Sequence, residues 1–233
     1  MTISIIIPTL NEEKNIGRLI RYLFLHNHSA VLEIIVSDGG SSDDTMGIAL
    51  AAGAKSVIAP QQGRAIQMNY GAMMASGDIF YFIHADTIPP ESYATDILHA
   101  VRNGFDFGRY RTRFEGSKWI LKINAFFTRF DWFVCHGGDQ TLFITRNLFG
   151  SLNGYDERIT IMEEYDLTVR AKKLRKYKIL RKASLISARK YDQNSWWQVQ
   201  RANYIIVKMY KKGASQDKLV KRYNELIKYR GCL

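Results

Sequence analysis

The segment "ISIIIPTLNEE", residues 3–13, forms the first structural unit of the chain. Its run of isoleucines reaches a proline at position 8, which is typical of a short buried β-strand. Asn11 is a candidate helix cap, and Glu12 and Glu13 are favourable in a first helical turn. One face of the helix that follows is predicted to carry the apolar side chains of Ile16, Leu19, Ile20, Leu23 and Phe24. The segment therefore predicts a strand that leads directly into an amphipathic helix.

The same alternation continues through the N-terminal part of the chain. Further strands are predicted at 33–38, 55–60 and 78–86. The helices between them are predicted from Ser42 to about Gly53 and over 63–76, with Gly77 ending the second. Strands and helices that alternate at this spacing imply right-handed crossovers. The fold class is therefore α/β, with a mainly parallel, Rossmann-like twisted sheet flanked by helices.

Polar residues follow three of these strands. The segments are "PTLNEE" (8–13), "SDGGSSDD" (37–44) and "HADT" (84–87). In sheets of this kind, ligands bind beyond the carboxyl ends of the strands. A pure scaffold would not need carboxylates at all three ends, so we expect a site there.

The C-terminal half has a less regular pattern. It is predicted to contain a strand at 106–116, an aromatic-rich helix at 117–133, a loop, strand and helix start within 137–149, a helix at 160–176, and terminal helices at 195–212 and 217–229. The helix at 160–176 carries Glu163, Glu164 and Asp166 in its first turn. The aromatic side chains of 117–133, with Trp196 and Trp197, are expected mainly in the core. The alternative is that these aromatic side chains form a surface on which a substrate binds.

Composition limits the class of protein. The chain has 233 residues, of which 46% are hydrophobic, which is enough for a full buried core. No apolar stretch approaches the ~20 residues of a membrane-spanning helix. The first residues lack the basic region of a signal peptide. Cys135 and Cys232 have no metal-ligand spacing. These features predict one large or two small domains in a reducing cytoplasm.

The net charge of +11 is unevenly distributed. Residues 1–166 hold 14 Lys and Arg against 19 Asp and Glu, whereas residues 167–233 hold 19 against 3. This asymmetry indicates an anionic partner for the C-terminal part: nucleic acid, phospholipid or a phosphorylated substrate. A solvated basic face is the alternative. No nucleic-acid-binding motif is present, so we expect no nucleic-acid partner. We expect a cytoplasmic protein that can rest on the anionic inner face of a membrane.

Several segments together resemble the inverting nucleotide-sugar glycosyltransferases of family two, which have the GT-A fold. The opening "SIIIPTLNE" is similar to that family's first strand and loop, and "IIVSDGGSSDDT" to its nucleoside-binding loop. "GRAIQMNYGAMMASGDIFYFIHAD" is similar to the segment that leads to its Asp-X-Asp motif. The resemblance covers about residues 1–190. It implies a nucleotide-binding part at about 1–104, an acceptor part at about 105–190, and a basic helical extension at 191–233.

The Asp-X-Asp pattern of the family reads His84-Ala85-Asp86 in this chain. In the family it holds a divalent cation on the donor diphosphate, which implies Asp86 as the ligand of Mg²⁺ or Mn²⁺. His84 departs from the pattern. It could coordinate Mn²⁺, donate to the ribose or phosphate, or only pack. A contact with the donor is the role we favour.

The resemblance also implies a catalytic base. In "GGDQTLFITRNLFGSLNGYDERITIMEEYDL", residues 137–167, the family carries a Glu-Asp pair at the start of a helix, where this chain has Glu163-Glu164. By position Glu164 takes the role of the base that deprotonates the acceptor hydroxyl, with Glu163 as the second candidate. The side chain is one methylene longer than the family's aspartate.

The resemblance further implies the residues around the two substrates. The nucleoside would contact Pro8, Thr9, Asn11 and Glu12, together with Asp38 and Arg64. Arg189 and Lys190 stand where the family closes a loop over the diphosphate. The acceptor site would be floored by Gly138, Asp139 and Gln140, next to Gly137. The carboxylate of Asp38 and the loop after the first strand indicate a uridine or guanosine diphosphate sugar as donor, with the UDP-sugar favoured. The acceptor is unknown.

Two other function classes compete with this interpretation. A sugar-phosphate nucleotidyltransferase is also α/β, but it would be expected to carry a Gly-rich, Arg-containing loop after the first strand, and "PTLNEE" is neither. A non-catalytic protein that binds nucleotide or a membrane surface would account for the basic C-terminal region. The carboxylates at the strand ends argue against it.

Overall fold

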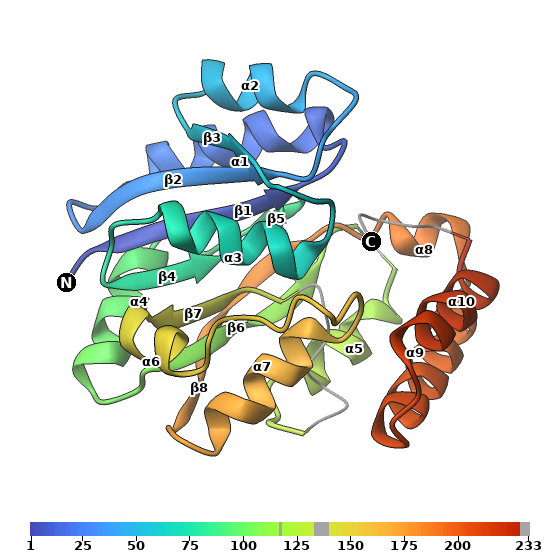
Figure 1. The fold of residues 1–233 in the computed structure, drawn as a ribbon. Coiled ribbons are helices and arrows are strands. Elements are labelled where there is room, and N and C mark those ends of the chain that lie inside the picture. Colours follow the sequence, from blue (N-terminus) through green and yellow to red (C-terminus); the bar gives the residue numbers. More distant parts are fainter. Residues whose placement is uncertain (117, 133–139, 229–233) are drawn as a thin grey trace.

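The structure is a computed structural model that describes residues 1–116, 118–132 and 140–228. It is built on an eight-stranded sheet with the strand order β3-β2-β1-β4-β7-β6-β8-β5 (Figure 1). The N-terminal elements are β1 (Ile3–Thr9), α1 (Glu13–Leu25), β2 (Val31–Asp38), α2 (Thr45–Ala51), β3 (Lys55–Ile58), α3 (Arg64–Met74) and β4 (Ile79–Phe82). These four strands pair with one another in parallel. The predicted Rossmann-like half is therefore confirmed.

The second half makes the sheet mixed. Its elements are β5 (Thr87–Ile88), α4 (Tyr93–Arg102), β6 (Phe107–Phe114), α5 (Leu121–Phe127), β7 (Leu142–Thr145), α6 (Arg146–Ser151), α7 (Glu163–Lys172), β8 (Tyr177–Ile186), α8 (Lys190–Gln193), α9 (Trp196–Lys211) and α10 (Gln216–Leu226). β7 runs antiparallel to both β4 and β6, and β5 runs antiparallel to β8. β6 and β8 pair in parallel.

Apolar side chains cover both faces of the sheet. Along β1, Ile5 and Ile7 pack with the buried face of α1, while Ile6 points the other way and packs with α3. β4 follows the same pattern, because Tyr81 belongs to the cluster on the α1 side of the sheet and Phe80 to the cluster on the α3 side. Alternate residues of a strand point to opposite faces, so a strand buried on both sides reads as a continuous apolar run. This explains the composition of "ISIII".

Three local predictions about the N-terminal half were wrong. Asn11 does not cap α1: it has a φ of 54°, and the cap position is Glu12, whose side chain makes no capping hydrogen bond. Phe24 is 43% exposed and lies off the buried face of α1. Gly77 is not the residue that ends α3, because Ala75 ends it in an extended conformation. A Cβ on Gly77 would lie 2.7 Å from the backbone nitrogen of Ser4, so close packing against β1 requires this glycine.

The strand predicted at 78–86 is shorter than expected. β4 ends at Phe82, and the chain turns before Thr87 begins β5. Residues 83–86 therefore form a bend rather than a strand end. The aromatic helix is also shorter, because α5 spans seven residues and buries only Leu121. Trp119 and Trp197 are 69% and 75% exposed, so the prediction of a mainly core position is wrong for both.

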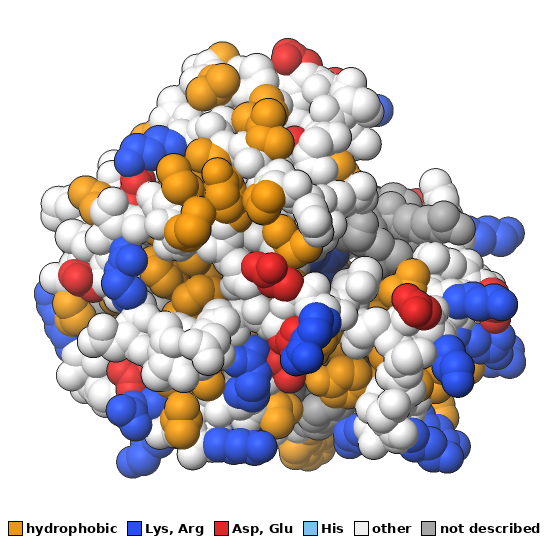
Figure 2. All heavy atoms as spheres, in the orientation of Figure 1, with side chains coloured by type: hydrophobic (Ala, Val, Ile, Leu, Met, Phe, Trp, Pro, Cys, Tyr) orange, Lys and Arg blue, Asp and Glu red, His pale blue; other side chains and the backbone are white. Residues whose placement is uncertain are grey.

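The C-terminal helices α9 and α10 pack against each other at one end of the molecule (Figure 1). Figure 2 shows Lys and Arg side chains over these helices and along the adjoining lower edge. Among the described residues, no helix is long and apolar enough to cross a membrane.

Candidate active site

A cavity of about 650 Å³ opens beyond the carboxyl ends of β1 and β4 and extends to α9. Most of the residues that the sequence singled out line it: Pro8, Glu12, Arg64, His84, Asp86, Gln140, Glu163, Glu164, Arg189 and Lys190. Thr9, Asn11 and Asp38 are not among its lining residues. Gly137, Gly138 and Asp139, predicted for the acceptor site, lie outside the described residues. Segments that are far apart in the sequence are thus brought together at the predicted edge of the sheet.

Asp38 organises the loop that follows β2. It is 1% exposed. Its carboxylate accepts hydrogen bonds from the hydroxyl of Thr9 and from the backbone nitrogens of Gly40 and Ser41, at 2.7 to 2.9 Å. The Ser41 hydroxyl adds another bond at 2.5 Å. A carboxylate held in this way fixes a turn with closely spaced backbone N–H groups.

Asn11 joins this turn to the loop after β1. Its side-chain oxygen accepts from the backbone nitrogen of Ser42 at 2.8 Å, and its own backbone nitrogen donates to the Ser41 hydroxyl at 2.8 Å. The left-handed conformation of Asn11 permits both contacts, since asparagine tolerates this region better than most residues. The two loops predicted to bind the nucleoside therefore form one unit.

A chain of charges crosses the cavity. Arg189 donates to both oxygens of Glu12, at 2.5 and 3.1 Å, and contacts Asp86 at 3.0 Å. Glu12 is nearly buried and also accepts from Asn15 at 2.6 Å. The candidate metal ligand and the candidate diphosphate cation are therefore in direct contact.

The two candidate bases have different partners. Glu163 is 3% exposed, and its carboxylate contacts Arg64 of α3 at 3.2 Å. A buried charge needs such a counter-ion, because desolvation is costly. The carboxylate of Glu164 lies 3.0 Å from Nε2 of His84, and both side chains line the cavity. His84 thus touches the candidate base.

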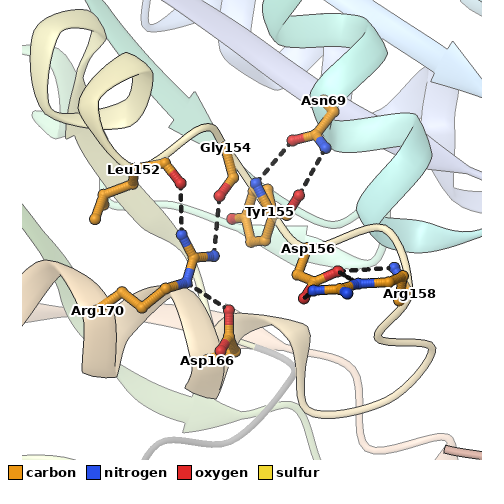
Figure 3. A network of polar contacts seen from close by, with 8 residues as sticks. All are labelled: Asn69, Leu152, Gly154, Tyr155, Asp156, Arg158, Asp166 and Arg170. Carbon is orange, nitrogen blue, oxygen red and sulfur yellow. Dashed lines mark hydrogen bonds and ion pairs between the residues drawn. The ribbon is translucent and has the colours of Figure 1, made fainter.

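The loop between α6 and α7 is held in place from two sides, as Figure 3 shows. Asn69 of α3 donates to the backbone oxygen of Tyr155 and accepts from its backbone nitrogen, both at 2.9 Å. Arg170 of α7 donates to the backbone oxygens of Leu152 and Gly154 at 2.7 and 2.9 Å, and to Asp166 at 2.7 Å. The loop before α7 is therefore fixed to both helices.

Met162, directly before Glu163, has a φ of 75°. A left-handed conformation costs an unbranched non-glycine residue about 1–3 kcal/mol and persists where the surroundings enforce it. The carboxylates of the first turn interact favourably with the N-terminus of α7. Burial raises the pKa of Tyr155 well above its usual value, and Glu164 and Glu163 raise it further, so this phenol stays neutral beside them.

The lining residues fit a cation held jointly with a ligand. No group of three or more His, Cys, Asp or Glu side chains in the described part of the chain could hold a metal ion alone. Asp86 offers one carboxylate, now in contact with Arg189. Mg²⁺ commonly keeps one or two carboxylates, with phosphate and water completing its coordination. Asp86 suits that arrangement.

Two positioning residues escaped the sequence analysis. Gln67 is 4% exposed and donates to the backbone oxygens of Thr9 at 2.6 Å and Ser37 at 3.2 Å, tying together the ends of β1 and β2. Asn69 holds Tyr155. Both are amides in the otherwise apolar stretch "AIQMNYGA", and that contrast was the available signal.

Residues 4–151 match the family described as glycosyl transferase family 2. This match covers more than half of the chain, so the chain belongs to that family. Glucosyl-3-phosphoglycerate synthase of Mycolicibacterium smegmatis is 35% identical over 98 residues, which are 39% of this chain and 32% of that protein. The chain thus spans about a third of that relative's length. A PGL/p-HBAD biosynthesis glycosyltransferase of Mycobacterium bovis is 26% identical over 187 residues, 72% of this chain and 68% of that protein.

Solved structures show the same fold. Glucosyl-3-phosphoglycerate synthase from Mycobacterium tuberculosis, in complex with Mg²⁺ and uridine diphosphate, superposes with a TM-score of 0.66 at 21% identity. The match covers 91% of this chain and 80% of that one. The same protein has been solved with Mn²⁺, UDP-glucose and phosphoglyceric acid, and this structure also gives a TM-score of 0.66. The GT-A fold expected from the resemblance is therefore confirmed.

Proposed function

We propose that this protein transfers a hexosyl group from a UDP-sugar to a hydroxyl acceptor with inversion, assisted by Mg²⁺ or Mn²⁺. The observation that carries the proposal is the pair of contacts made by one short bend. His84 contacts Glu164, while Asp86, two residues on, contacts Arg189. A candidate base and a candidate diphosphate cation thus flank the same bend, as an inverting displacement requires.

The donor would be held by the loops that Asp38 and Asn11 join, with its diphosphate near Asp86, Arg189 and Lys190. When bound, a divalent cation neutralises negative charge on the diphosphate leaving group. Arg189 has its guanidinium against Glu12 and Asp86 in this structure. On donor binding it would turn towards the phosphates, whose oxygens suit the bidentate hydrogen bonds of a guanidinium.

The acceptor oxygen would attack the anomeric carbon from the side opposite the diphosphate. The bond between that carbon and the diphosphate oxygen breaks as the new bond forms, and UDP leaves. Glu164 takes the hydroxyl proton. His84 would orient its carboxylate, and Arg64 would hold the neighbouring Glu163 in place.

Two measurements test the proposal together. UDP should raise the melting temperature more with Mn²⁺ than with EDTA, because a ligand that prefers the folded state stabilises it. Glu164→Gln should keep this shift and lose transfer activity by about 10²–10⁴-fold, the usual contribution of a general base. Glu163→Gln is the matched comparison.

The proposal fails if no nucleotide shifts the melting temperature, which would favour a non-catalytic binding protein. Equal shifts with Mn²⁺ and EDTA would remove the metal role from Asp86. If Glu163→Gln abolishes turnover while Glu164→Gln is mild, the roles of the two glutamates are exchanged.

We also propose that the basic C-terminal region meets an anionic membrane surface. The exposed cations of α9, α10 and their connection are Arg201, Lys208, Lys211, Lys212, Lys218 and Lys221. They support the proposal because each basic residue near an anionic bilayer adds about 1 kcal/mol of attraction.

A further inference from the structure

The cavity has two chemically different ends. At the end nearest β1 and β4 it is lined by charged side chains: the cations of Arg64 and Arg189 and the carboxylates of Glu12, Asp86, Glu163 and Glu164. Both cations already contact carboxylates of the same site. The third lining cation, Lys190, lies over the ring of Tyr223 of α10. A small anionic acceptor, bound in addition to a nucleoside diphosphate, would find no separate cation cluster among the described lining residues.

The other end is mainly apolar and aromatic, with the amides of Gln200 and Asn203 also in its lining. α9 faces the cavity with Val199, Asn203, Ile206 and Val207, whose spacing of three and four residues places them on one side of the helix. Phe127 of α5 and Trp132 also line the cavity. Apolar side chains of α9 and aromatic side chains of a second segment therefore border the same space.

Phe127 and Trp132 belong to a cluster of aromatic side chains outside the hydrophobic core, here called the aromatic ledge. Its members are Phe126, Phe127, Phe130 and Trp132. Phe130 stacks on Trp132 at 4.8 Å between ring centroids, and Phe126 contacts Phe127 at 5.7 Å. Even so, Trp132 is 55% exposed and Phe127 43% exposed. Exposed apolar surface of this kind usually marks a binding site. Here it borders the same cavity as Glu164, so its occupant would be the part of the acceptor remote from the reacting hydroxyl.

We infer that the acceptor is a lipid alcohol, whose hydrocarbon body lies between α9 and the aromatic ledge while its hydroxyl reaches Glu164. The inference rests on the proposed function and narrows the acceptor to one chemical class. The bond changes are those of the proposed transfer: the alcohol oxygen bonds to the sugar, UDP leaves with the broken bond's electrons, and Glu164 receives the proton.

Binding of straight-chain alcohols tests the inference without requiring knowledge of the sugar. Hexanol, octanol and decanol are titrated into the protein saturated with UDP and Mn²⁺, and tryptophan fluorescence reports binding near Trp132. Each added methylene should tighten binding about fourfold, the equivalent of ~0.8 kcal/mol per buried methylene. Release of UDP from UDP-glucose in the presence of these alcohols should follow the same order.

Val207→Gln places a polar group in the apolar wall and should weaken decanol binding by roughly tenfold, with UDP binding unchanged. Ile205→Gln is the matched control, because Ile205 is a partly exposed residue of the same helix that does not line the cavity. It should bind decanol like the parent protein.

The outcomes separate the two proposals. If the parent protein does not bind UDP, the proposed function itself is overturned. Intact UDP binding with no dependence on chain length, or with tighter binding of phosphoglyceric acid than of decanol, would overturn only the lipid alcohol. Equal effects of Val207→Gln and Ile205→Gln would also overturn it.

Discussion

His84 occupies the first position of the pattern that reads Asp-X-Asp in the family, and its ring lies 3.0 Å from the carboxylate of Glu164. His84→Asp would restore the pattern but remove the partner of Glu164. We expect nucleotide binding with Mn²⁺ to tighten, because an anionic oxygen attracts a dication more strongly than a neutral imidazole does. We expect turnover to fall by about 10- to 100-fold, the equivalent of one hydrogen bond to a charged group.

Calorimetric titration with UDP and steady-state transfer rates separate these two effects. His84→Asn is the matched control, because it has the size of aspartate without the charge. It should lose turnover without gaining affinity, and its pH–rate profile should differ from that of the parent, which a merely structural role would not cause. If both variants bind UDP more weakly, His84 contacts the donor rather than positioning Glu164.

At this scale the sequence indicated which residues gather, but not how they contact one another. The order of "PTLNEE", "SDGGSSDD" and "HADT" after parallel strands placed most of the site at one edge. The partners of Arg189 could not be predicted, since it is 177 positions from Glu12 and contacts it only through the fold. Asp38 was expected to face the nucleotide, whereas its oxygens are engaged by its own loops.

The loop between α6 and α7 leads into the helix that carries Glu164, and Asn69 anchors it. Asn69→Ala would leave the backbone nitrogen and oxygen of Tyr155 without their side-chain partner. Each buried polar group left in this way costs about 1–3 kcal/mol. Because two groups are affected, we expect the free energy of unfolding, measured in urea, to fall by roughly 2–6 kcal/mol. Transfer activity should also fall, because α7 shifts.

Asn147→Ala is a suitable control because Asn147 is an exposed asparagine of α6. It should leave both quantities unchanged. An Asn69→Ala protein as stable and active as the parent would show that Arg170 alone fixes the loop.

The strand β8 and the direction of β7 were not predicted, for different physical reasons. β8 was missed because a bulge interrupts its alternation: Leu180 pairs with Tyr110, but Ala183 pairs with the next residue, Arg111. Arg181 and Lys182 fall within this irregularity, and their charges mask the strand pattern. The antiparallel direction of β7 depends on the long connection before it, which local periodicity does not encode.

Across the whole molecule, the apolar end of the cavity and the basic helices lie on the same side. α9 contributes its apolar face to the cavity, and its other residues include the exposed Arg201 and Lys208. A protein that takes a lipid alcohol must meet it at a bilayer, and the exposed cations of α9 and α10 would hold it there. The excess of positive charge in the C-terminal part would then bring the apolar end of the cavity close to the membrane that contains the lipid substrate.

Vesicle co-sedimentation tests this arrangement. The protein should bind vesicles that contain anionic phosphatidylserine better than neutral ones, and rising salt should weaken the binding, because exposed charges are screened. Replacing both Lys212 and Lys218 by glutamate should lower the partition coefficient roughly tenfold or more, since each basic residue near the surface contributes about 1 kcal/mol. The matched control exchanges the exposed Lys173 and Lys176, in the turn after α7, for glutamate and so changes net charge equally.

If both double variants lose binding to the same extent, only net charge matters and the basic helices hold no preferred orientation at the bilayer. Binding that is indifferent to salt would instead point to insertion of the aromatic ledge alone.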